Sequence, residues 1–128
     1  MIYYVDALRR YVDFSGRASR AQYWYFVLWN LLLSGAAALA LFCLGSFIGG
    51  ERAGDTLVDA AMGTYSLAIV IPSISVAVRR LHDIDASGWW ILVGLIPGAG
   101  SLALIVAYCI PGTRGPNRFG PEPAQPPS

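Results

Sequence analysis

The sequence contains no lysine, and charged side chains make up only 13% of its 128 residues. Three runs carry no charge at all: residues 21–50, 60–78 and 86–113, which are 30, 19 and 28 residues long. A hydrocarbon core of about 30 Å is crossed by about 20 helical residues, so each run is long enough to span a membrane. The scarcity of charge argues against a soluble domain and predicts an integral membrane protein.

Cysteine and histidine are also scarce. Cys43 and Cys109 lie inside apolar runs without a neighbour at metal-ligand spacing, so no disulfide scaffold is indicated. The single histidine, His82, would form a poor metal site with Asp83 and Asp85, because no further His or Cys accompanies them. Motifs of nucleophilic catalysis and of phosphate-binding loops are absent as well. We therefore expect no enzyme activity, no metal and no cofactor.

Hydrophobic residues make up 55% of the chain, and the mean hydropathy is +0.52. This composition predicts an all-α integral membrane protein in which residues 1–121 form one membrane domain and residues 122–128 are disordered. The expected elements are an N-terminal interfacial amphipathic helix and three transmembrane helices, with spans at about 21–48, 57–78 and 89–110.

The first run also raises the alternative of a cleaved signal peptide, with residues 38–40 (Ala-Leu-Ala) as a small-residue cleavage site. Against this, the residues before the run include Asp6 and Asp13, and the apolar stretch continues past residue 40. An uncleaved first span is favoured.

The third run is interrupted at Pro97-Gly98. One alternative is a single span over 89–110 with a kink at this proline. The other is a re-entrant hairpin, because neither half is long enough to span alone. Re-entrant backbone must be buried in protein or line water, and a chain with two other spans offers little cover without oligomerisation. The kinked span is therefore favoured, and the hairpin remains the alternative.

The arginines set the expected orientation. All nine basic residues are arginines outside the apolar runs, and the connection at 51–59 carries one arginine against three acids. The positive-inside rule then places the N-terminus and residues 79–85 in the cytoplasm and the acidic connection outside. A kinked third span would leave Arg114 and Arg118 outside, which the same rule disfavours.

Local patterns predict how the helices begin and pack. Four apolar residues at helical spacing, Tyr4, Leu8, Tyr11 and Val12, indicate an interfacial helix. Ser19 with Gln22 matches a capping box, so the first span should begin near residues 18–21. Within the spans, Pro72 should kink the second helix, and Asn30 should form a hydrogen bond to another helix.

The segment after the second span holds most of the polar chemistry. If the second helix continues into it, Arg79 and Asp83 lie one turn apart and can pair. Ser87 can cap the next helix ahead of Trp89 and Trp90, which suit a membrane interface.

Three segments in order resemble a known family, and the resemblance covers about residues 1–121. They are Phe14-Ser-Gly-Arg17-Ala-Ser-Arg20 with Tyr23-Trp24, then Arg79-Arg80-Leu81-His82-Asp83 with Ser87-Gly88-Trp89-Trp90, then Pro111-Gly112-Thr113 with Gly115-Pro116-Asn117-Arg118-Phe119-Gly120. The chain is similar to the bacterial inner-membrane family known as domain of unknown function 805. This implies a location in the bacterial plasma (inner) membrane and no assigned activity, and the apolar runs make the protein multi-pass. Asp85 and Ala86 depart from the family pattern, which has Gly and a basic residue there.

Two function classes follow. The favoured one is a non-catalytic membrane module that docks on anionic lipid, on a partner membrane protein or on a second copy of itself, with no nucleic acid as partner. The alternative is a small oligomeric transporter or channel component, although the predicted spans lack the ionisable residue that ion pathways use. The predicted docking residues are Arg17, Arg20, Arg79, Arg80, His82, Asp83, Trp89, Trp90, Asn117 and Arg118.

Overall fold

The computed structural model describes residues 1–124. Within this range the elements are α1 (Ile2–Arg9), α2 (Arg20–Gly49), α3 (Glu51–Asp83), the 3-10 helix η1 (Gly88–Leu95) and α4 (Ala99–Cys109). Two of these helices, α2 and α3, are long and apolar enough to cross a membrane, and α4 is a shorter apolar helix. The prediction of a helical chain with long apolar helices is confirmed at this level.

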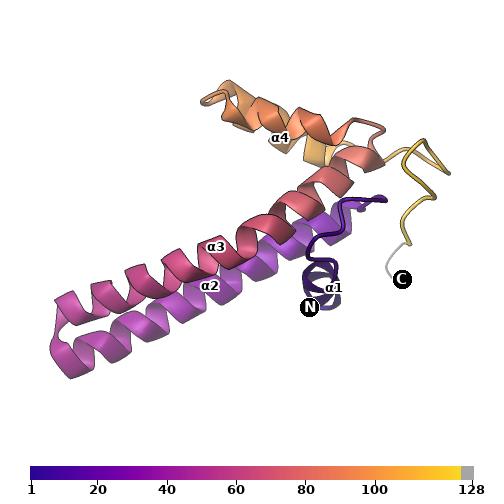
Figure 1. Cartoon of the computed structure of the whole chain (residues 1–128). Helices are drawn as coiled ribbons and strands as arrows, with labels where there is room; N and C mark the ends of the chain where they lie inside the picture. The colour runs from indigo at the N-terminus through magenta and orange to yellow at the C-terminus, as the bar shows by residue number, and fades with distance from the viewer. Residues whose placement is uncertain (125–128) are drawn as a thin grey trace.

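Helices α2 and α3 lie side by side and are joined by a very tight turn (Figure 1). Gly50, whose φ of +80° is accessible mainly to glycine, is the one residue between them. The prediction of a connection at 51–59 is therefore wrong, because these residues form the first turns of α3. Close to the turn, Gly45 faces Gly54 so closely that a Cβ on Gly45 would lie 2.6 Å from the Gly54 Cα.

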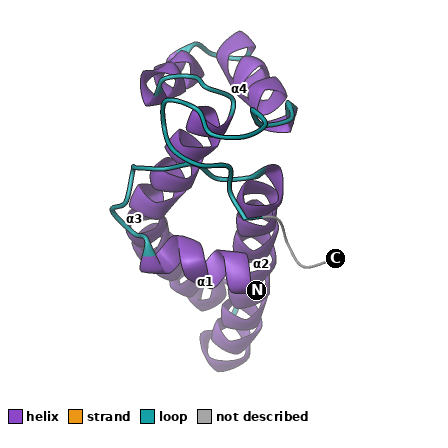
Figure 2. Cartoon of the chain, turned by 90° about the vertical axis from the view of Figure 1, so that its right-hand side faces the viewer, coloured by secondary structure: helices purple, strands orange, loops and turns teal. Residues whose placement is uncertain are grey.

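Helix α1 lies across the α2–α3 pair (Figure 2). The Tyr4 ring stacks on Phe26 of α2 with 5.4 Å between centroids, and its hydroxyl is 3.1 Å from the Tyr65 hydroxyl of α3. Tyr65 in turn donates a hydrogen bond to the Asn30 side chain, which confirms the predicted interhelical role of Asn30. Helix α1 ends earlier than the apolar pattern indicates, and Val12 lies beyond its end with 69% of its surface exposed.

The segment after α1 compensates for the proline in α3. Pro72 lies inside α3 and has no N–H, so the carbonyl of Ala68, four residues earlier, loses its helical partner. The Tyr11 hydroxyl donates to that oxygen instead. Nearby, the Ser75 hydroxyl donates to the Asp13 carbonyl at 2.5 Å. The segment between α1 and α2 is thus attached to α3 on both sides of the proline.

Replacing Tyr11 with phenylalanine should lower the free energy of unfolding by about 1–3 kcal/mol, because the Ala68 carbonyl is left without a donor. Thermal unfolding in detergent micelles measures this loss. In a Pro72→Ala background the same change should cost far less, because the substituted alanine has a backbone N–H that can reach the Ala68 oxygen. An equal cost in both backgrounds would show that Tyr11 acts through ring packing and not through its hydroxyl.

The third apolar run folds back on itself, so the favoured kinked span is wrong. Gly98, with a φ of +74°, lies at the reversal between η1 and α4. The two halves are so close that a Cβ on Gly100 would overlap the Val93 carbonyl oxygen. Both ends of the hairpin return to the end of α3, where the Thr113 amide donates to the Asp83 carbonyl at 2.7 Å. The alternative of a hairpin is the fold that the chain adopts.

Candidate functional site

A buried cluster of three charges lies at the C-terminal end of α3. The Arg17 Nε donates to Asp83 Oδ1 at 3.0 Å, and the Arg80 Nη1 donates to Asp83 Oδ2 at 2.8 Å. Their side chains are 1%, 0% and 5% exposed for Arg17, Arg80 and Asp83, respectively. Each carboxylate oxygen thus has its own guanidinium partner, which is the arrangement that a buried acid requires.

The remaining donors of both arginines reach backbone carbonyls in the last part of the chain. Arg80 donates to the carbonyls of Tyr108, at 3.1 Å, and of Ile110. Arg17 donates to those of Thr113 and of Gly115, the latter at 2.6 Å. Burial lowers the pKa of Arg80, and the Asp83 carboxylate opposes this change. An arginine stays charged nonetheless, because its ordinary pKa lies far above neutrality. The cluster therefore joins four segments: the segment between α1 and α2, α3, the end of α4, and the tail that follows α4 (residues 110–124).

Gly112 is essential to this packing. A Cβ at this position would overlap Asp83 Oδ2, inside the space of the carboxylate. Nothing in the sequence distinguishes Gly112 from the other glycines and prolines of residues 111–121. Its role depends on the close approach of Asp83, which only the fold reveals.

His82 is also part of the folded structure. Its Nδ1 is 2.9 Å from the Gly16 carbonyl, so this nitrogen carries the proton in the hydrogen bond. Its ring stacks on Phe119 with 4.0 Å between centroids, and the Asn117 side-chain amide donates to its carbonyl at 2.9 Å. The predicted residues His82 and Asn117 therefore hold the tail against α3.

Arg118 forms an exposed ion pair with Asp85, with Nε to Oδ1 at 3.2 Å. Its guanidinium also lies over the Phe119 ring, 4.8 Å from the centroid. Trp89 and Trp90, on η1, are exposed and lie outside the charged cluster. Ser87 caps η1 by accepting a hydrogen bond from the Trp89 amide, as predicted.

Arg79 does not pair with Asp83, which corrects the expected i, i+4 ion pair. The side chain is buried, and its Nε has no hydrogen-bond partner among residues 1–124. Burial lowers the pKa of Arg79, and the nearby carboxylates of Asp13 and Asp6 oppose this change. Arg17, Arg79 and Arg80 are thus all inside the protein, so they do not form the accessible docking surface expected from the sequence.

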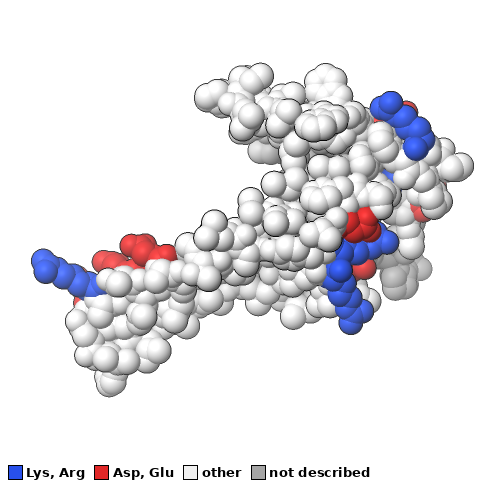
Figure 3. Space-filling model, viewed as in Figure 1, with Lys and Arg blue, Asp and Glu red and all other residues white. Residues whose placement is uncertain are grey.

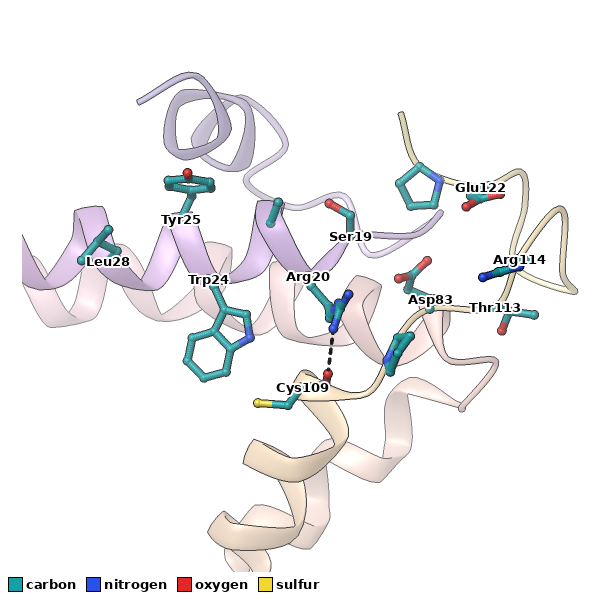
Figure 4. Close-up of a pocket in the computed structure, with 14 residues that line it drawn as sticks. Ser19, Arg20, Trp24, Tyr25, Leu28, Asp83, Cys109, Thr113, Arg114 and Glu122 are labelled. Atoms are coloured by element: carbon teal, nitrogen blue, oxygen red, sulfur yellow. Dashed lines mark hydrogen bonds between the residues drawn. The ribbon is translucent and has the colours of Figure 1, made fainter. Parts of the chain in front are cut away.

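A pocket of about 790 Å³ lies between the start of α2 and the tail (Figure 4). Arg20 and Arg114, both exposed, contribute cations, and Arg20 Nη1 donates to the Cys109 carbonyl at 3.4 Å. Trp24 and Leu28 continue the lining along α2 as apolar surface. The pocket therefore combines a cationic end with an apolar wall. The sequence prediction included Arg20 but missed Arg114, which had no signal beyond its charge.

The structure also places Glu122 on this pocket, with its Oε2 accepting a hydrogen bond from the Gly115 amide at 2.9 Å. Glu122 belongs to the tail segment 122–128 that the composition predicts to be disordered. Residues 125–128 of that segment lie outside the described residues.

Comparison with known proteins gives a consistent result. The sequence pattern of the family described as "Protein of unknown function (DUF805)" matches residues 11–121. "Inner membrane protein YhaH" of Escherichia coli (strain K12) is 42% identical over 123 residues, covering 96% of this chain and 97% of the relative. "Inner membrane protein YhaI" of the same organism is 39% identical over 123 residues, covering 96% of both chains. No solved structure matches this chain.

Proposed function

This chain belongs to the DUF805 family of proteins of unknown function. We propose that it is a multi-pass inner-membrane protein that docks on anionic lipid and does no chemistry. The relatives YhaH and YhaI, which match almost their whole length, are both named as inner membrane proteins. The proposal is supported by the positions of the charges, the interfacial helix and the pocket.

The charged residues indicate where the bilayer lies. Figure 3 shows blue and red atoms at the two ends of the α2–α3 pair, with a white surface between them on this face. Helix α1, which carries Arg9, packs on α2 at Phe26 and suits the interface. From Phe26 to Gly49, α2 rises about 35 Å, slightly more than the thickness of a hydrocarbon core.

The hairpin favours an orientation with the N-terminus in the cytoplasm. It brings Arg114 and Arg118 to the end that also holds Arg20, whereas Arg52 is at the other end among acids. The positive-inside rule is then satisfied by every segment, which a third full span would not allow. In this orientation η1 and α4 re-enter the bilayer from the cytoplasmic side.

Labelling of Cys109 tests this orientation. In a Cys43→Ala background, a membrane-impermeant thiol reagent should modify Cys109 when it is added to inside-out vesicles and should fail to do so with spheroplasts. The reason is that Cys109 is exposed and lies at the arginine-rich end, beside Arg20. Modification from the outer side alone would contradict the cytoplasmic placement of this end.

The observation that carries the docking proposal is the gathering of exposed arginines at one end. Arg9, Arg10, Arg20, Arg114 and Arg118 are exposed there, while Arg17, Arg79 and Arg80 are buried inside the protein. Each arginine near an anionic headgroup contributes about 1 kcal/mol to membrane attraction. Guanidinium groups also bind phosphate with two parallel hydrogen bonds, which favours a phosphate-bearing partner.

The proposal predicts selective retention of lipid. After gentle detergent extraction, native mass spectrometry should show the wild-type protein carrying added phosphatidylglycerol in preference to phosphatidylethanolamine. Raised salt should weaken the preference, because the exposed charges are screened. Equal retention of both lipids at low salt would contradict the proposal. Retention of a second protein without lipid preference would instead support docking on a membrane partner.

A further inference from the structure

The pocket between α2 and the tail differs from the rest of the arginine-rich surface because it has a defined shape. Arg20 is the first residue of α2, and Arg114 follows the tail segment that the buried cluster holds in place. Figure 4 shows both side chains around the pocket, with Asp83 between them. The cationic end is therefore built on the same scaffold as the buried cluster.

The charges around the pocket favour an anion. Asp83 lines it, but both of its oxygens are occupied by Arg17 and Arg80. Glu122 is the other acid of the lining, and one of its oxygens is occupied by the Gly115 amide. The arginines of the cluster and of the lining thus outnumber the two carboxylates by four to two. Arg20 and Arg114 form no ion pair with either acid among the described residues.

The remaining lining requires an apolar part in the ligand. Trp24 and Leu28 lie one and two turns further along α2, at the start of the proposed membrane segment, and both are exposed. A small inorganic anion would leave this wall bare, whereas the acyl chain of a lipid would cover it. The volume of about 790 Å³ is enough for a headgroup together with the first part of a chain.

We infer that this pocket holds one anionic phospholipid, with its phosphate bound by Arg20 and Arg114 and its acyl chain along Trp24 and Leu28. The inference rests on the proposed lipid-docking function and adds a specific site to it. The exposed Arg9 and Arg118 lie outside the pocket and contribute only general attraction to the membrane surface.

The experiment compares two double variants that lose the same charge. Phosphatidylglycerol is titrated into the detergent-solubilised full chain, and binding is measured by native mass spectrometry. The variant with Arg20→Gln and Arg114→Gln should bind at least about tenfold more weakly than wild type, since it loses the charge-assisted hydrogen bonds of two arginines to the phosphate. The control with Arg9→Gln and Arg118→Gln should stay within a few-fold of wild type, because these two arginines lie outside the pocket and the detergent-solubilised chain has no membrane surface for them to attract. Thermal unfolding checks that both variants are folded.

Each outcome has a distinct meaning. Equal loss of binding in both double variants would overturn the defined site while leaving general lipid docking intact. A wild-type protein without preference for phosphatidylglycerol would overturn the docking proposal itself. Inorganic phosphate is the second probe, and competition by phosphate at the affinity of the lipid would show that no acyl chain is recognised.

If the glutamine variant fails to fold, the variant with Arg20→Lys and Arg114→Lys replaces it. This variant keeps the charge, and it should still bind measurably more weakly than wild type because lysine lacks the bidentate geometry of arginine.

Discussion

Replacement of Asp83 with asparagine is expected to cost about 3–5 kcal/mol in the free energy of unfolding, because it removes the only carboxylate that pairs with Arg17 and Arg80 in the described chain. Both guanidinium groups would remain buried and charged without a counterion. The hairpin and the tail should then detach from α3, since the same arginines hold their carbonyls. Unfolding temperature in micelles and protease sensitivity of the tail measure the two effects.

Asp85 provides the matched control. It also pairs with an arginine, Arg118, but the two side chains are 47% and 61% exposed. Exposed ion pairs contribute about 0–1 kcal/mol, so Asp85→Asn should change the unfolding temperature little. If the Asp83 and Asp85 variants behaved alike, the buried cluster would not be the feature that holds the arginine-rich end together.

Replacement of Gly45 with alanine should also destabilise the protein strongly. The added Cβ would lie 2.6 Å from the Gly54 Cα and 2.9 Å from the Ala53 carbonyl oxygen, so the clash is with backbone that cannot rotate away. Forcing α2 and α3 apart next to their single-residue turn should cost about 1–3 kcal/mol or more. Thermal unfolding in micelles measures the change.

Gly35 allows the same substitution in the same helix without the clash, since nothing lies within 4 Å of the position that a Cβ would occupy there. Gly35→Ala should be neutral or stabilising by about 0.5–1 kcal/mol, because alanine is the better helix former. A Gly45 variant as stable as the Gly35 variant would mean that the helices can separate at the turn without loss.

Features that depend on residues close together in the chain were predictable without the fold. The capping box of Ser19 and Gln22 is present, with the Gln22 amide 3.2 Å from Ser19 Oγ and the Ser19 amide 2.8 Å from Gln22 Oε1. The start of α2, the cap at Ser87 and the two long apolar helices were likewise predictable. Each depends on the composition of one segment or on groups within one helical turn.

Other features depended on parts of the chain that are far apart in sequence. Helix geometry allows Asp83 to pair with Arg79 or Arg80, because residues three and four apart are both neighbours on a helix. Arg80 is selected because the carbonyls of Tyr108 and Ile110 lie where its other donors point. The sequence held no signal for those carbonyls, since every residue has one.

Composition and local pattern were thus enough to predict a helical, apolar chain whose charges lie outside its three apolar runs. The reversal of the third run at Gly98 and the burial of Arg17 and Arg80 depend instead on contacts between distant segments of the folded chain. The reason is that a run of apolar residues interrupted by Pro-Gly is compatible with both a kinked span and a hairpin, and the run itself holds no charge that would select the hairpin. The choice is made by buried charges, which must find partners wherever the chain can supply them.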